Sequence, residues 1–97
     1  MKNQTKKQNT DLLCSAVSLI TDAEECKIFL DDICTVKEIE SLAQRLEVAC
    51  MLDEGLTFNE IAAKTGASSA TISRVNKCLN YGDGGYMSVI KKLKNNK

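Results

Sequence analysis

Short hydroxylated and basic side chains gather between residues 57 and 79, where together they could bind DNA. Lysine and arginine neutralise phosphates, while hydroxyl and methyl groups reach the edges of bases in the major groove. The candidate DNA-binding residues are Thr57, Asn59, Lys64, Ser68, Ser69, Ala70, Thr71, Ser73, Arg74 and Lys77. Such chemistry requires a rigid element that holds these side chains outward.

The pattern from Thr57 to Leu79 predicts that element as a short helix, a tight turn and a second helix. Ile61, Ala62, Ile72 and Val75 are apolar at the positions where two steeply crossing helices must touch. Gly66 falls at the turn, where positive φ favours glycine. The outer face of the second helix is then small, hydroxylated and basic, which is typical of a DNA-binding helix-turn-helix. The alternative is a helical hairpin that only builds a core.

The 97 residues contain no proline and no long alternating run, so we expect one nearly all-helical domain. Residues 1–10 are polar and lysine-bearing, and we expect a disordered arm there, with the first helix beginning near Asp11. Residues 11–97 would form the domain. It divides into a dimerisation scaffold (11–56), the helix-turn-helix (57–79), and a glycine-rich joint with a last helix (80–97).

Capping signals set the expected helix boundaries. Capping boxes are predicted for Thr21 with Glu24, Thr35 with Glu38 and Thr57 with Glu60, an N-cap at Ser68, and a helix end at Gly55. The helix from residue 36 to about residue 54 has the stripe Val36, Ile39, Leu42, Ala43, Leu46, Ala49 and Cys50. Val48, Met51 and Leu52 fall outside this stripe, so the helix needs neighbours on more than one side. Some of those neighbours would belong to a second copy.

Charge is segregated along the chain although the formal net charge is zero. Residues 1–10 are basic, residues 11–56 hold eleven acidic against three basic residues, and residues 57–97 hold seven basic against two acidic residues. The basic part coincides with the expected DNA reader, which favours an electropositive face for phosphates. Solvated charges at the ends of a helical protein would give the same pattern.

The residue types do not indicate catalysis or metal binding. There is no histidine, and the five cysteines lack Cys-x-x-Cys spacing, so we expect no zinc site, no cofactor and no enzyme activity. Free thiols and the lack of a signal-peptide pattern predict a cytoplasmic location. No apolar run approaches the length of a membrane span.

The run from Gly66 to Arg74 resembles the recognition segment of the tryptophan repressor family, and the resemblance extends back through residues 42–45 and 54–55. The segment Asn80-Tyr81-Gly82-Asp83-Gly84-Gly85-Tyr86 is similar to a Firmicute subgroup, the YerC/YecD-like relatives. This resemblance implies an all-α fold of about six helices with a helix-turn-helix, an intertwined homodimer, and a transcriptional regulator, typically a repressor, that binds double-stranded DNA.

The resemblance also implies an effector pocket. In tryptophan repressors two arginines flank the bound amino acid, and Arg45 and Arg74 match them here. The family has a glycine after the second arginine, whereas this chain has Val75. A branched side chain would intrude on the pocket, so we expect no gating by tryptophan and name no effector. The alternatives are a protein-interaction module that keeps the dimer without DNA binding, and an amino-acid-gated repressor.

Overall fold

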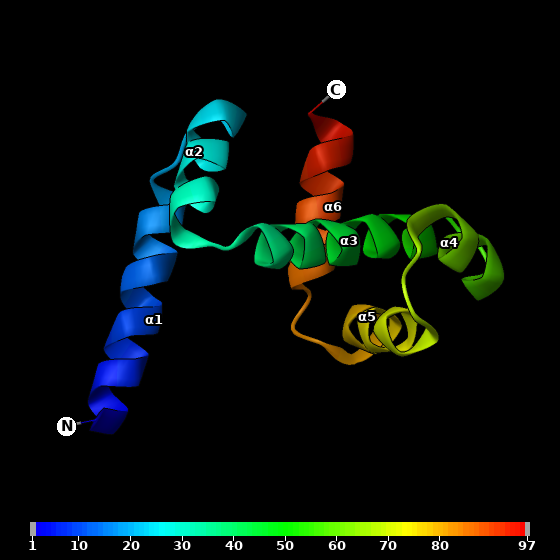
Figure 1. Cartoon of the computed structure of the whole chain (residues 1–97), viewed down its shortest axis with the longest axis horizontal. Coiled ribbons are helices and arrows are strands. Elements are labelled where there is room, and N and C mark those ends of the chain that lie inside the picture. Colours follow the sequence, from blue (N-terminus) through cyan, green and yellow to red (C-terminus); the bar gives the residue numbers. More distant parts are fainter. Residues whose placement is uncertain (1, 97) are drawn as a thin grey trace. The chain divides into compact units, whose positions relative to one another are not determined.

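The computed structural model describes residues 2–96, with side chains described from Lys6 to Asn96, and it is all-α over that range. Its six helices are α1 (Lys2–Ser18), α2 (Ala23–Ile33), α3 (Val36–Asp53), α4 (Phe58–Thr65), α5 (Ser69–Tyr81) and α6 (Gly85–Asn95) (Figure 1). The chain divides into two compact units, residues 1–39 and residues 40–97. The expected division at residue 56 differs from this one, because the second half of α3 packs with the helix-turn-helix.

The first helix begins earlier than expected. Residues 2–10 form the first turns of α1, whereas we expected a disordered arm over residues 1–10 and a helix start near Asp11; Met1 lies outside the described residues. The segment has no glycine or proline to stop a helix, and its lysines and glutamines are good helix formers. The low hydrophobicity of residues 2–10 therefore did not prevent them from joining α1.

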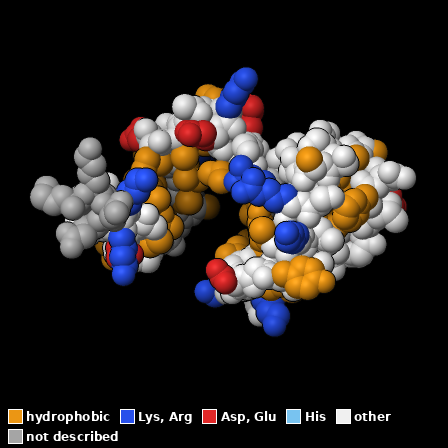
Figure 2. Space-filling model, turned by 90° about the horizontal axis from the view of Figure 1, so that it is seen from below, with side chains coloured by type: hydrophobic (Ala, Val, Ile, Leu, Met, Phe, Trp, Pro, Cys, Tyr) orange, Lys and Arg blue, Asp and Glu red, His pale blue; other side chains and the backbone are white. Residues whose placement is uncertain are grey.

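Residues 6–39 bury little on their own. None of these side chains is fully buried, and Ala16, Cys26, Phe29 and Leu30 are only half-buried. Large hydrophobic side chains are instead exposed on α1, just after it, on α2 and at the start of α3: Leu12, Leu13, Val17, Leu19, Ile28, Ile33 and Val36. Figure 2 shows hydrophobic side chains on one face of the molecule. A unit of this kind needs apolar contacts beyond its own side chains.

Two of the predicted helix starts in this unit are tested by hydrogen bonds. The capping box of Thr35 and Glu38 is confirmed, because Thr35 Oγ1 accepts from the Glu38 amide at 3.1 Å and Glu38 Oε1 accepts from the Thr35 amide at 2.8 Å. The predicted N-cap at Thr21 is wrong. Asp22 caps α2 by accepting from the Glu25 amide at 2.8 Å. Asp22 is as good an N-cap residue as threonine, and its carboxylate accepts from the Glu25 amide in the first turn of α2.

The hydrophobic core lies in the second unit, where α3, α4, α5 and α6 meet. Its buried side chains are Val48, Ala49, Ile61, Ala67, Ile72, Val75 and Ile90. The predicted contacts of Ile61, Ile72 and Val75 are confirmed, and Ala62 packs against this core. Val48 is completely buried although it lies outside the stripe expected for α3, whereas Leu42, in that stripe, remains 46% exposed.

An ion pair joins α6 to α3 across this core. Lys94 Nζ lies 2.6 Å from Asp53 Oδ2, and this hydrogen bond raises the pKa of Lys94 above its usual value. The ammonium group of Lys94 is thus held by Asp53 at the last turn of α3. The pair fixes the far end of α6.

Because of Glu60 at the start of α4, we expect the stability of the fold to decrease at acid pH. Glu60 Oε1 accepts from the Thr57 amide at 2.8 Å, and this bond, with the Thr57 hydroxyl and Lys64, lowers the pKa of Glu60. A carboxyl whose pKa is lower in the folded state contributes stability that is present above its ordinary pKa of 4.5 and is lost as pH falls through the folded-state value.

Glu60→Gln keeps the capping geometry and removes the charge, so it isolates this effect. In thermal unfolding between pH 7 and pH 3, we expect the wild type to be more stable than Glu60→Gln near neutral pH, and the two curves to converge at the acid end. Curves that stay parallel over this range would contradict the assignment.

Candidate nucleic-acid interface

Two capped helices and a left-handed turn build the helix-turn-helix. Thr57 and Glu60 form the predicted capping box at the start of α4. Gly66 ends α4 with φ +73°, the left-handed conformation predicted for it. Thr65 Oγ1 then accepts from the Ala67 amide at 3.0 Å, and Ser68 caps α5 by accepting from the Thr71 amide at 3.1 Å. The short connection between α4 and α5 is therefore held by hydrogen bonds between residues that are close in sequence.

The second helix, α5, presents three different faces. Ile72 and Val75 are buried against the core. The candidate residues that are fully exposed on α5 are Ser69, Ala70, Ser73, Arg74 and Lys77. Thr71 is half-buried and, with Arg74 and Cys78, it lines a cavity toward α3. The DNA-binding residues predicted on α5 are therefore divided between two faces. Ser69, Ala70, Ser73 and Lys77 lie on the outward face, and Thr71 and the side chain of Arg74 line the cavity.

The remaining candidates lie at or before the two helix starts. Asn59 and Lys64 are exposed on α4. Thr57 and Ser68 are exposed N-caps whose hydroxyls already bind backbone amides, and the Ser68 hydroxyl also donates to Thr71 Oγ1 at 3.1 Å. Seen from the side of α5, lysine and arginine side chains stand out from the surface of this unit (Figure 2). The arrangement suits Ser69, Ser73 and Lys77 to contact a ligand, and the two caps to stiffen the helix starts.

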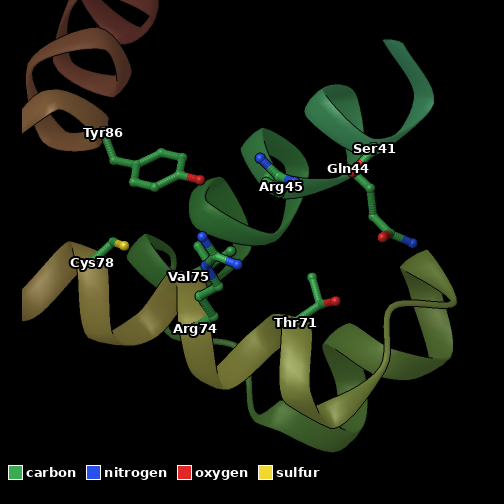
Figure 3. Close-up of a pocket in the computed structure, with 8 residues that line it drawn as sticks. All are labelled: Ser41, Gln44, Arg45, Thr71, Arg74, Val75, Cys78 and Tyr86. Atoms are coloured by element: carbon green, nitrogen blue, oxygen red, sulfur yellow. The ribbon is translucent and has the colours of Figure 1, made fainter. Parts of the chain in front are cut away.

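The cavity of about 260 Å³ between α3, α5 and α6 contains both arginines of the expected effector pocket. Its lining side chains are Ser41, Gln44, Arg45, Thr71, Arg74, Val75, Cys78 and Tyr86 (Figure 3). Within residues 6–96, neither Arg45 nor Arg74 forms an ion pair with a carboxylate. Val75 is only 2% exposed and belongs to the core as well as to the cavity wall.

Sequence reasoning missed two residues of this site. Gln44 Nε2 donates to the Thr65 carbonyl at 3.2 Å, which ties α3 to the turn of the helix-turn-helix. Tyr86 reaches from α6 toward the cavity and lines it, whereas in the sequence it was noted only as the end of the glycine-rich segment 80–86. For Gln44, the only indication in the sequence was that it stands next to Arg45. Nothing in the sequence indicated the position of Tyr86, because the α3 residues that line the cavity with it are distant in sequence.

The described part of the chain contains neither a metal-binding cluster nor a membrane-spanning helix. Among these residues, no group of cysteine and acidic side chains is arranged to hold a metal ion. None of the helices described combines the length and the apolar character that crossing a bilayer would require.

Comparisons with known proteins agree on one family. A family profile described as Trp repressor protein matches residues 8–94. The uncharacterized protein YerC of Bacillus subtilis (strain 168) is 54% identical over 84 residues, covering 87% of this chain and 81% of YerC.

Two solved structures have the same fold. A TrpR-like protein from Eubacterium eligens ATCC 27750 matches with a TM-score of 0.87 and 50% identity, over 95% of each chain. A proposed Trp repressor from Staphylococcus aureus matches with a TM-score of 0.85 and 42% identity, over 90% of this chain and 87% of its own. Because the profile and both structures cover nearly all of the described helices, this chain belongs to the Trp repressor family.

Proposed function

We propose that this protein is a homodimeric regulator of transcription, typically a repressor, that inserts α5 into the major groove of double-stranded DNA and needs no tryptophan to do so. The observation that carries the proposal is the division of α5. Its inner face is fixed in the core by Ile72 and Val75, while Ser69, Ser73 and Lys77 are exposed. A helix held in this way can offer one rigid face to a groove.

The side chains of that face suggest how DNA would be bound. Lys64, Arg74 and Lys77 would contact phosphates, which position the protein without reading sequence. Ser69, Ala70 and Ser73 are too short for bidentate contacts to guanine or adenine. Specificity would therefore come from hydroxyls, contacts to thymine methyl groups, bridging water and DNA shape, and it would be modest for a single subunit. Membership of the Trp repressor family supports this reading.

The exposed hydrophobic side chains of residues 6–39 support a second copy as partner. Leu12 is 69% exposed, Ile28 61% and Val36 72%, and no side chain described in this unit is fully buried. A dimer in which these helices pack on a second chain would cover them, and it would also place two copies of α5 side by side. Two such helices could enter successive major grooves about 34 Å apart.

The proposal of ligand independence depends on Val75. Its side chain is packed in the core and forms part of the wall between Arg45 and Arg74. An indole placed against Arg74 at the position of Val75 would have to displace this packed side chain, which costs about 1–3 kcal/mol. Without a ligand, the two arginines would be available for phosphates.

DNA binding is tested by its dependence on salt. For the wild type we expect the logarithm of the association constant to fall linearly with the logarithm of salt concentration, and Lys77→Ala to reduce that slope by about 0.9, the value of one phosphate contact. Lys77→Ala should weaken binding to unrelated sequences equally, as measured by fluorescence anisotropy.

Lys27→Ala is the matched control, because Lys27 is exposed on α2 and paired with Asp31 at 2.9 Å. It should leave the slope unchanged. A wild type without salt-sensitive DNA binding would refute the regulator and favour the protein-interaction module, whose partner would survive nuclease treatment in a pull-down.

Dimerisation is tested by a charge on the exposed apolar surface. We expect the wild type to sediment as a dimer and Ile28→Lys to shift it toward monomer, since a buried unpaired ammonium is costly. Glu24→Gln, an exposed change on the same helix, should sediment as the wild type does. A wild type that sediments as a monomer would contradict the proposed assembly.

Ligand independence is tested by titration calorimetry with a panel of amino acids. We expect no binding heat from tryptophan at millimolar concentration, because Val75 occupies space that the indole would need. A micromolar dissociation constant for any amino acid would instead establish a gated regulator.

A further inference from the structure

Tyr86 lies at the centre of unit 2 in a position that neither the proposed DNA contacts nor the core explains. It is half-buried and packs against the core, yet its ring extends from α6 into the cavity between α3 and α5 (Figure 3). The phenol oxygen is directed toward α3 and the side chain of Arg45, with Arg74 and Val75 of α5 on the other side of the ring.

A second hollow adjoins the first at Cys78 and Tyr86, which line both. It has a volume of about 570 Å³ and a largely apolar wall formed by Leu46, Cys78, Val89 and residues 82–86. Removal of the Tyr86 ring would therefore enlarge the free space at both hollows.

The glycine-rich connection brings Tyr86 to this place. Only residues 82–84 separate α5 from α6. A Cβ at Gly82 would collide with the carbonyl oxygen of Cys78, so the close return of the chain at this point requires glycine. At the other end of α6, Lys94 is bound to Asp53 of α3. Because one end of α6 is tied to α5 and the other to α3, the position from which the Tyr86 ring reaches the cavity is fixed.

We propose that Tyr86 is a positioning residue: its ring forms part of the wall of the arginine cavity, where α3, α5 and α6 meet, and so holds α5 in its DNA-binding pose. Its DNA readout rests on the proposed function. The ring shares the cavity wall with Arg45 of α3 and with Val75 and Cys78 of α5, and it packs against the core. Loss of the ring would remove this support and allow α5 other positions.

The test removes the Tyr86 ring by mutation and then supplies a similar aromatic ring as a small molecule in solution. Tyr86→Ala lacks the phenol group of the tyrosine side chain, and the space that it leaves adjoins both hollows, so that a small aromatic molecule such as p-cresol can enter it. We expect Tyr86→Ala to bind DNA about 5- to 150-fold more weakly than the wild type, the range of typical coupling between sites. Millimolar p-cresol should restore the affinity and raise the melting temperature of Tyr86→Ala, with no effect on the wild type.

Companion variants separate positioning from general stability. Tyr86→Phe keeps the ring and should bind DNA within about twofold of the wild type, a free-energy change well under 1.4 kcal/mol. Ser88→Ala, an exposed change on α6, should behave as the wild type in both assays. If Tyr86→Ala does not fold, Tyr86→Leu replaces it, with reduced DNA affinity expected and with weaker rescue by p-cresol, because leucine keeps part of the side-chain volume.

Three results would overturn the inference. They are wild-type DNA affinity in the folded Tyr86→Ala or Tyr86→Leu variant, no effect of p-cresol on either, and an equal effect of p-cresol on the wild type. If the wild type does not bind DNA, the proposed function fails by itself. The thermal shift of Tyr86→Ala with p-cresol then decides on its own whether removal of the ring leaves a ligand-sized space.

Discussion

The packing of α4 and α5 on the second half of α3 is the interaction on which the rest of this structure depends. Val48 and Ala49 of α3 are completely buried against Ile61 of α4 and Ile72 of α5. Because the chain is short, few side chains share this core, and each contributes a large part of the stability. The direction in which α5 faces is determined by these contacts and by the left-handed turn at Gly66.

One helix, α3, serves three purposes at once. Its last turns supply core residues and Asp53, which binds Lys94. Its middle carries Gln44, which bonds the turn before α5, and Arg45, which lines the cavity. Its earlier residues Val36 and Leu42 remain exposed in the single chain. A helix with apolar residues on several sides is consistent with neighbours from the same chain on one side and from a second chain on another.

The cavity between α3, α5 and α6 brings together side chains from three helices. Arg45 and Arg74 both line it, and the sequence resemblance matches them to the two arginines that flank the amino acid in tryptophan repressors. Val75 and Tyr86 form further parts of its wall. A regulator that binds no metabolite in this cavity would respond to its own concentration and to salt, which is the main functional consequence of the two proposals.

The sequence by itself determined the local structure. Capping residues, Gly66 and the apolar positions of the helix-turn-helix are short-range signals, and Ser68, Thr57 and Gly66 were placed correctly because the hydrogen bonds and φ angles that define them involve neighbours. The first helix was misjudged at residues 2–10 because composition, unlike a cap, does not mark a boundary. Only the tertiary structure could show that Thr71 and Arg74 line a cavity, that Lys94 pairs with Asp53, and that Tyr86 lines the same cavity as the two arginines. These contacts join residues up to 41 positions apart, and their geometry follows from how the helices pack rather than from any local pattern.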